Sequence, residues 1–171
     1  MGWTGWRRSD DSRCSADERL REEARGSMRL ERRCVLDADR ETVWKVVSNP
    51  DCYPEFMASL ERWETVTEGP PDVGSRFTAH WKVGSVPIGG IVELVEFDPQ
   101  RDLAWIGITG VTLRGRFRLR DNGDGRAKVT FRLSYEAPGG LLGLIADRVA
   151  ARQVGRTMSE TLKRLKTMVE G

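Results

Sequence analysis

Two neighbouring segments in the second half of the chain alternate strictly between apolar and polar residues, and this pattern limits the possible folds more than any other feature. The segments cover residues 111–120 and 126–136 and are joined by the turn sequence DNGDG. In the first, Leu113, Phe117 and Leu119 alternate with Arg114, Arg116, Arg118 and Arg120. In the second, Val129, Phe131, Leu133 and Tyr135 alternate with Lys128, Thr130, Arg132 and Ser134. This alternation predicts an antiparallel hairpin with one buried face and one solvated face.

Further strand-like runs precede this hairpin. They lie at 29–36, 61–67, 74–83, 86–97 and 102–108. Their connections include GPPDVG, VGS and DPQ, and short connections of this kind favour antiparallel pairing. We therefore expect seven antiparallel strands, most of them in a meander.

Helical periodicity appears in three places. Asp37 or Asp39 offers an N-cap before ETVWKVVSN, and PDCYPEFMASL follows with apolar residues at helical spacing. After Pro138, a long run without proline carries one apolar stripe. The stripe consists of Leu144, Ala151, Val154, Met158, Leu162, Leu165 and Val169. We expect an α+β fold in which a curved seven-stranded antiparallel sheet wraps around a long C-terminal helix, with two short helices after the first strand.

The amino-acid composition indicates how the chain divides into a tail and a domain, and which classes of partner are not expected. Residues 1–27 have too few apolar positions for a core face, so we expect a flexible charged tail followed by one domain at 28–171. The 28 basic and 26 acidic side chains give no bulk electrostatic case for nucleic-acid binding. No apolar run reaches about 18 residues, so no integral membrane segment is expected. Three cysteines without CxxC spacing, and no apolar stretch after the early arginines, indicate a cytoplasmic protein. The oligomeric state stays open.

Four segments carry a resemblance to a known family. They are ADRETVWKVVSNPDCYPEFM, VGSRF, VELVEFDPQRDLAW and YEAPGGLLGLIADRVAARQVGRTMSETLKRLK. Their order and spacing resemble the helix-grip fold of the START-like (SRPBCC) superfamily, and most closely its bacterial branch of polyketide cyclase/dehydrase and lipid transport proteins. The resemblance implies a cavity between the concave sheet face and the C-terminal helix. Such a cavity holds a hydrophobic small molecule, and no cofactor is expected.

We expect this cavity to be lined by residues of the short helices, the apolar strand faces and the last helix. The candidates are Tyr53, Phe56, Phe77, Trp81, Glu93, Trp105, Phe117, Phe131, Gly155, Met158 and Leu162. Gly155 is included because a residue without a side chain lets the sheet or a ligand approach the helix closely. The alternative for each aromatic residue is that it simply fills the core.

The role of Glu93 depends on which face of its strand points inward, because both faces carry apolar residues. If Val95 and Phe97 point inward, the Glu93 carboxyl lies among apolar side chains, its pKa rises, and it can act as an acid or a ligand anchor. If Val92 and Leu94 point inward, Glu93 is solvated.

The sequence favours a binding or carrier module for a lipid, an isoprenoid or a polyketide-like compound. One alternative is an aromatase/cyclase or dehydratase that moves protons with Tyr53, Glu93 or Arg76, and another is a partner-binding or toxin-like module without a ligand. His80 is the only histidine, so no metal centre is expected. The arginine row at 114–120 could contact phosphate or an anionic membrane surface, which leaves peripheral membrane contact open, although such a row is more often the solvated back of a sheet.

Overall fold

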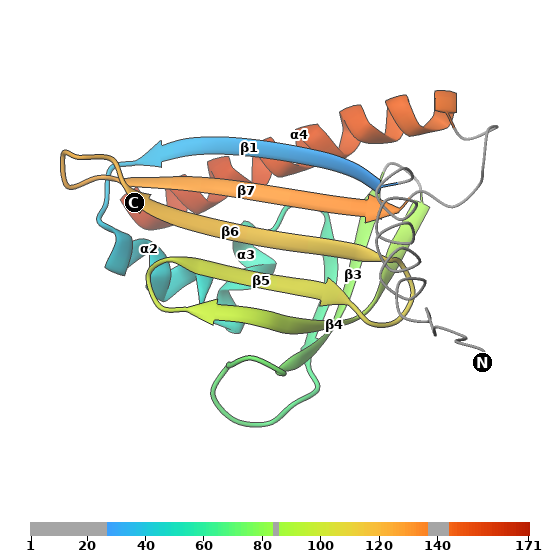
Figure 1. Cartoon of the computed structure of the whole chain (residues 1–171), viewed down its shortest axis with the longest axis horizontal. Helices are drawn as coiled ribbons and strands as arrows, with labels where there is room; N and C mark the ends of the chain where they lie inside the picture. Colours follow the sequence, from blue (N-terminus) through green and yellow to red (C-terminus); the bar gives the residue numbers. More distant parts are fainter. Residues whose placement is uncertain (1–26, 84–85, 137–143) are drawn as a thin grey trace, which may run out of the picture.

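The computed structural model describes residues 27–83, 86–136 and 144–171, which form a curved sheet packed against one long helix (Figure 1). The strands are β1 (Ser27–Leu36), β2 (Leu60–Thr65), β3 (Arg76–Val83), β4 (Val86–Asp98), β5 (Asp102–Gly107), β6 (Leu113–Asp121) and β7 (Ala127–Glu136). The helices are α2 (Arg40–Val47), the 3₁₀ helix η1 (Pro50–Cys52), α3 (Tyr53–Phe56) and α4 (Leu144–Glu170). The expected tail lies almost entirely outside the described residues.

The seven strands form one antiparallel sheet in the order β1-β7-β6-β5-β4-β3-β2. Strands β2 to β7 form a meander, and β1 pairs with β7 at the far edge. The DNGDG turn between β6 and β7 places Gly123 and Gly125 at φ of +88° and +80°, and the Asp121 carboxylate accepts a hydrogen bond from the backbone N–H of Gly123. The α+β helix-grip prediction is therefore confirmed.

The short helices lie between β1 and β2 in the chain and cover part of the inner face of the sheet. Asp39 is the N-cap of α2, where its side chain accepts a 2.7 Å hydrogen bond from the backbone N–H of Thr42. Val43, Val47 and Phe56 have no exposed surface. These helices therefore contribute buried side chains to the core.

Helix α4 covers the rest of the inner face. Val154, Met158, Leu162 and Leu165 are buried at helical spacing, which confirms this part of the predicted stripe, whereas the side chain of Leu144 lies outside the described ones. The buried Thr161 accepts a 3.0 Å hydrogen bond on its hydroxyl from the backbone N–H of Ala58. This bond ties α4 to the residues that follow α3.

The orientation of β4 is resolved by its register with β3. Val92 pairs with Phe77 and both are buried, whereas Glu93 pairs with Arg76 on the opposite face of the sheet. A β-bulge follows between Leu94 and Glu96 in the pairing with β5. Before the bulge, the β4 side chains that point toward the core are thus Val92 and Leu94. The Glu93 side chain therefore does not lie among buried apolar side chains.

Gly115 allows an aromatic ring to lie directly over the β6 backbone. It pairs with Trp105 of β5, and a Cβ atom at Gly115 would lie 2.2 Å from Cζ2 of the Trp105 indole. Any larger residue at this position must displace the ring, which is itself almost fully buried.

Candidate functional site

Three aromatic rings, one each from α3, β2 and β3, form a continuous stack. The Trp63 indole lies parallel to Tyr53, with ring centroids 4.6 Å apart, and parallel to Phe77, with centroids 4.8 Å apart. The interplanar angles are 12° and 11°. Trp63 therefore occupies a slot whose two walls are aromatic faces.

The stack continues into the core through edge-to-face contacts. Trp105 meets Tyr53 at 73°, with the ring centroids 6.3 Å apart. Beyond it, Phe117 and Phe131 stack at 4.5 Å, and Phe56 meets Phe117 edge-on. Offset and edge-on pairs of this kind contribute about 0.5–1.5 kcal/mol beyond area burial.

Two polar groups of the stack lie in this apolar surrounding. The indole N–H of Trp63 is buried, and no side chain or backbone group among the described residues accepts a hydrogen bond from it. Burial raises the pKa of the Tyr53 phenol, so the group stays neutral and can donate a hydrogen bond. A buried donor without a partner is unfavourable, so Trp63 marks a position where an acceptor would be stabilising.

Little free space remains beside the stack. A cavity of about 10 Å³ lies here, enough for about one water molecule. It is lined by Ser48, Pro50, Tyr53, Trp63, Pro71, Phe77, Leu94, Leu103 and Trp105. A ligand larger than water enters only if one of these side chains moves.

The cavity beside the stack includes some of the residues predicted to line a site, and the packed core includes others. Of the predicted residues, Tyr53, Phe77 and Trp105 line the cavity, and no α4 residue whose side chain is described is among the lining residues. The other predicted apolar positions belong to the packed core around it. These are Phe56, Trp81, Phe117, Phe131, Met158 and Leu162.

Gly155 faces a different neighbour from the one expected. A Cβ atom there would lie 2.5 Å from a terminal guanidinium nitrogen of Arg32, which extends from β1 under α4. Arg32 Nε also donates to the Ser159 hydroxyl at 3.3 Å. The space left by the missing side chain is thus taken by Arg32, and the structure does not bring Gly155 to the aromatic site.

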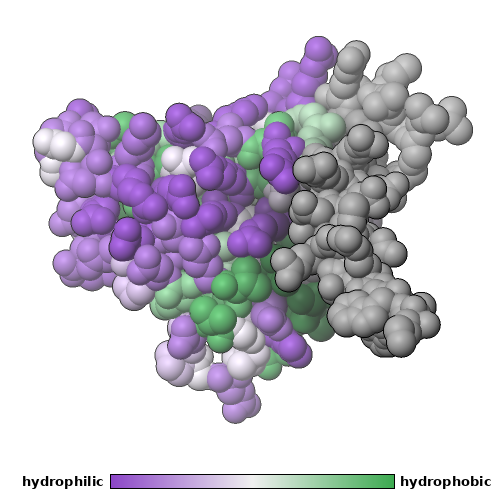
Figure 2. Space-filling view, in the orientation of Figure 1, coloured by the Kyte–Doolittle hydropathy of each residue, from purple (hydrophilic) through white to green (hydrophobic). Residues whose placement is uncertain are grey.

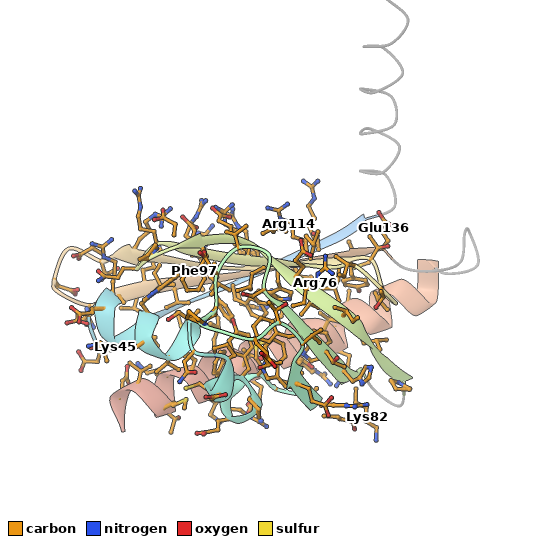
Figure 3. The ribbon with its side chains drawn as sticks, turned by 90° about the horizontal axis from the view of Figure 1, so that it is seen from below. Lys45, Arg76, Lys82, Phe97, Arg114 and Glu136 are labelled. Atoms are coloured by element: carbon orange, nitrogen blue, oxygen red, sulfur yellow. The ribbon has the colours of Figure 1, made fainter. Side chains whose placement is uncertain are left out.

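The three candidate proton-transfer groups are not brought together. Tyr53 lies inside, whereas Arg76 and Glu93 form a 2.8 Å ion pair on the outer face of the sheet, where Arg76 is labelled in Figure 3. The expectation that Glu93 serves as a buried acid or a ligand anchor is therefore incorrect for this structure, because its carboxylate points away from the core and pairs with a cation.

Trp63 is the site residue that the sequence interpretation missed. Its run begins with a bulge between Leu60 and Arg62, so the apolar positions are three residues apart and the period of 2 is broken. The signal that remained was a single tryptophan between the charged Arg62 and Glu64, which by alternation face the other way.

The described residues offer neither a metal cluster nor a reactive thiol at Cys34. No group of three His, Cys, Asp or Glu side chains is placed there to hold a metal ion. Burial raises the pKa of the Cys34 thiol to about 11, which keeps this cysteine unreactive near neutral pH. No described helix combines the length and the apolar character that crossing a bilayer requires.

Solved structures with this fold come from several organisms. TTHA0849 from Thermus thermophilus superimposes with a TM-score of 0.70 at 17% identity, over 84% of this chain and 96% of that one. The Zhui aromatase/cyclase from Streptomyces sp. R1128 gives 0.70 at 19%, over 84% and 94%. A START superfamily protein from Mycobacterium smegmatis gives 0.68 at 16%, over 83% and 97%. At these identities the likeness establishes the fold alone.

Comparison with known sequences identifies the protein family. No curated protein matches the chain. The family model described as polyketide cyclase / dehydrase and lipid transport matches residues 27–170, which begins at the first residue of β1 and ends at the last residue of α4. The fold and this match together place the chain in the polyketide cyclase / dehydrase and lipid transport family.

Proposed function

We propose that the protein binds and carries a hydrophobic small molecule with a planar ring, and that this ring takes the place of the Trp63 indole between Tyr53 and Phe77. The observation that carries the proposal is the parallel three-ring stack, in which the middle ring has a buried N–H without a partner among the described residues. A flat apolar ligand can replace the middle ring and keep both stacking contacts.

Trp63 is the lining residue best placed to move. It comes from β2, an edge strand that pairs with β3 alone among the described strands and carries a bulge. The Trp63 side chain is half-buried, whereas Tyr53 and Phe77 are buried. Its N–H makes no hydrogen bond with a described residue that would be lost on moving. Outward rotation of the Trp63 indole therefore breaks its stacking contacts with Tyr53 and Phe77, and the ring of the ligand replaces them.

The neighbouring loop supports the same route of entry. Residues 66–75 connect β2 to β3, and Pro71 of this loop lines the cavity. Val66 and Val73 of the same loop are exposed large hydrophobic residues, with 49% and 59% of their surface accessible. An apolar molecule approaching this loop meets apolar side chains on the way to the stack.

Carriage is better supported than catalysis. An aromatase/cyclase or dehydratase needs groups that accept and donate protons at the ligand, and Glu93 and Arg76 lie on the other side of the sheet. Tyr53 remains, but burial raises its pKa, so near neutral pH it acts as a hydrogen-bond donor to a ligand oxygen rather than as a base.

The proposal is tested by titrating the uncharged fluorophore N-phenyl-1-naphthylamine, chosen so that surface cations play no part. The wild type should bind one molecule saturably. Trp63→Ala should bind it about tenfold more tightly, because no indole has to be displaced. Trp44→Ala is the matched control, since Trp44 is half-buried and packs on Phe97 rather than in the stack.

Absence of saturable binding in both the wild type and Trp63→Ala would contradict the proposal, as would an equal change in Trp44→Ala. Mass spectrometry of natively purified protein then identifies a co-purified apolar molecule. Turnover of a poly-β-ketone that is lost in Tyr53→Phe would instead support the enzymatic alternative.

A further inference from the structure

The outer face of the sheet concentrates positive charge that the whole chain does not show. Eight cationic side chains project from β1, β6 and β7, and three carboxylates pair with them, although the net charge of the chain is only +2. The cations are Arg29, Arg33, Arg114, Arg116, Arg118, Arg120, Lys128 and Arg132, and the carboxylates are Glu31, Glu96 and Asp102. Hydrophilic residues dominate this face in Figure 2.

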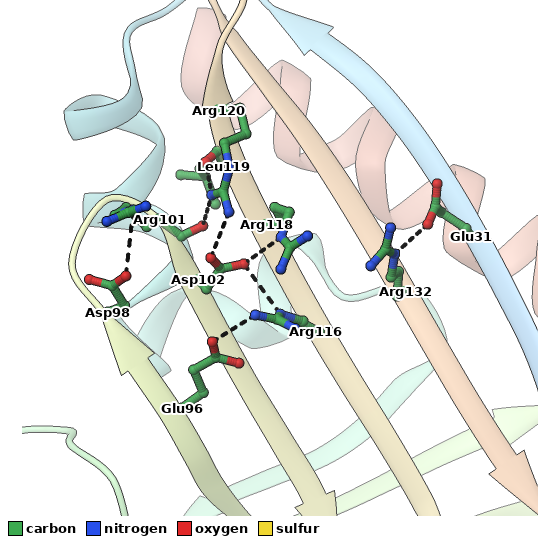
Figure 4. A network of polar contacts seen from close by, with 10 residues as sticks. All are labelled: Glu31, Glu96, Asp98, Arg101, Asp102, Arg116, Arg118, Leu119, Arg120 and Arg132. Atoms are coloured by element: carbon green, nitrogen blue, oxygen red, sulfur yellow. Dashed lines mark hydrogen bonds and ion pairs between the residues drawn. The ribbon is translucent and has the colours of Figure 1, made fainter.

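One part of this face is neutralised internally. The almost fully buried carboxylate of Asp102 accepts hydrogen bonds from Arg116, Arg118 and Arg120 at 2.8–3.2 Å (Figure 4). Arg116 also bonds to Glu96 at 2.7 Å. These bonds fix the guanidinium groups in place.

A second part has no internal ion pair, and the exposed Glu136 lies one outward-facing position beyond it on β7. Arg29 of β1 and Arg114 of β6 have no carboxylate partner among the described residues, and both are exposed. The β7 residue Ser134 lies between them, because it pairs with Arg29 on one side and Arg114 on the other. The two arginine backbones are thus two strand spacings apart, roughly 10 Å. Figure 3 shows Arg114 rising from the side of the sheet away from α4.

A trough of about 400 Å³ runs over this position. Its lining consists of Arg29, Leu30, Glu31, Arg114, Arg116, Arg132, Leu133 and Ser134. Arg132 is paired with Glu31, and Arg116 with Glu96 and Asp102, so they supply fixed walls. The two unpaired arginines lie at either side of the small Ser134.

We propose that this trough binds the phosphate group of a small soluble molecule, held between Arg29 and Arg114 over Ser134. A phosphate monoester carries close to two negative charges near neutral pH, which matches the two arginines without partners. Its oxygens accept the forked N–H groups of guanidinium in pairs, and the Ser134 hydroxyl supplies a further donor. A carboxylate would neutralise only one of the two cations.

The trough is independent of the aromatic site. It lies on the opposite face of the sheet, and the described residues that line the trough and the cavity are different. Failure of one proposal therefore leaves the other standing. A phosphate group recessed between β1 and β6 also differs from a flat membrane surface, which would engage the whole arginine row.

The test is a titration of inorganic phosphate followed by backbone amide shifts in NMR spectra, with acetate at matched ionic strength as the comparison. Phosphate should shift the amides around Ser134 saturably, and acetate should not. The double variant Arg29→Gln/Arg114→Gln should weaken binding by about tenfold or more, because both uncompensated cations are removed. Arg62→Gln on β2, which removes one charge from the opposite edge of the sheet, should leave the dissociation constant within about twofold.

Shifts that rise linearly without saturation, equal effects of phosphate and acetate, or an unchanged double variant would each overturn the phosphate site. Sedimentation with phosphatidylcholine vesicles containing phosphatidic acid distinguishes the source of the phosphate. Binding to these vesicles that needs Arg29 and Arg114 but is not displaced by inorganic phosphate would overturn the assignment to a soluble molecule.

Discussion

The two faces of β6 place opposite chemistry within one residue of each other. Phe117 is fully buried and stacks on Phe131, whereas the neighbouring Arg116 and Arg118 side chains keep 24% and 31% of their surface exposed and share the Asp102 carboxylate. The inner face holds together by apolar area and ring contacts, and the outer face by ion pairs. A single strand thus packs into the apolar core on one side and carries a charged network on the other.

The physical strength of these interactions differs in the same way. Burying one large apolar side chain contributes about 1.5–3 kcal/mol, whereas an exposed ion pair contributes about 0–1 kcal/mol. We therefore expect stability to depend on the inner face, and the outer face to be open to substitution except at Asp102.

The largest effect is expected for Phe117→Ala. This change leaves a cavity between Phe131, Trp105 and Phe56, all of which contact the ring. The free energy of unfolding should fall by about 3–5 kcal/mol. Urea denaturation followed by far-UV circular dichroism measures this, and a loss below that of Arg114→Ala on the same strand would refute the contrast between the faces.

Gly115→Ala should rank second. The added methyl group lies 2.2 Å from the Trp105 ring, so the ring must leave its packed position. A loss of about 3 kcal/mol is expected, at the upper end for overpacking. Combining it with Trp105→Leu, which removes the ring, should cost less than the sum of the two single changes. Strict additivity in this double-mutant cycle would show that the contact does not cause the loss.

Asp102→Asn should destabilise the protein by about 2 kcal/mol, because three guanidinium groups then face one another without a carboxylate. This is the one outer-face position where we expect a loss comparable to that of a core change. Denaturation of Arg101→Gln, whose ion pair with Asp98 is exposed, provides the control.

The same carboxylate gives the expected pH dependence. Burial alone would raise the pKa of Asp102, but the hydrogen bonds from Arg118 and Arg120 and the neighbouring positive charge outweigh it, so the pKa is lowered. A carboxyl group with a lowered pKa stabilises the folded state above its unfolded pKa of about 3.9, and this contribution is lost as the pH falls through the folded value. The difference between the wild type and Asp102→Asn should thus be constant near neutral pH and shrink below about pH 4. A difference that grew on acidification would contradict this sign.

The smallest effect is expected for Arg33→Gln. Its side chain is 58% exposed, and its partner Glu31 keeps a second ion pair with Arg132. The free energy of unfolding, measured by thermal denaturation, should change by less than about 0.5 kcal/mol. A larger loss would indicate that the outer ion pairs act as one cooperative network.

The architecture was readable from the sequence because local patterns and global fold agree. The alternation of Leu113 to Leu119, the turn glycines and the stripe of Met158, Leu162 and Leu165 each follow one period and occur in the predicted places. Where the period was broken or ambiguous, the sequence did not determine which side chains point into the core. Both faces of β4 are apolar, and only its pairing with β3 orients Glu93.

The site was less predictable, because it depends on contacts between distant segments. Trp63 follows a bulge, so no simple period marks it as inward. The space beside Gly155 is occupied by Arg32, a residue more than a hundred positions earlier that extends beneath α4. The ring stack joins α3, β2 and β3, and no pattern within one segment encodes their contact.

The central claim is that the inner aromatic stack opens at Trp63 to receive a ring. A crystal structure of the complex with N-phenyl-1-naphthylamine tests this most directly. We predict electron density for the naphthyl ring between Tyr53 and Phe77, with the Trp63 indole rotated out of the stack. A bound probe elsewhere, with the Trp63 indole still between those two rings, would contradict it.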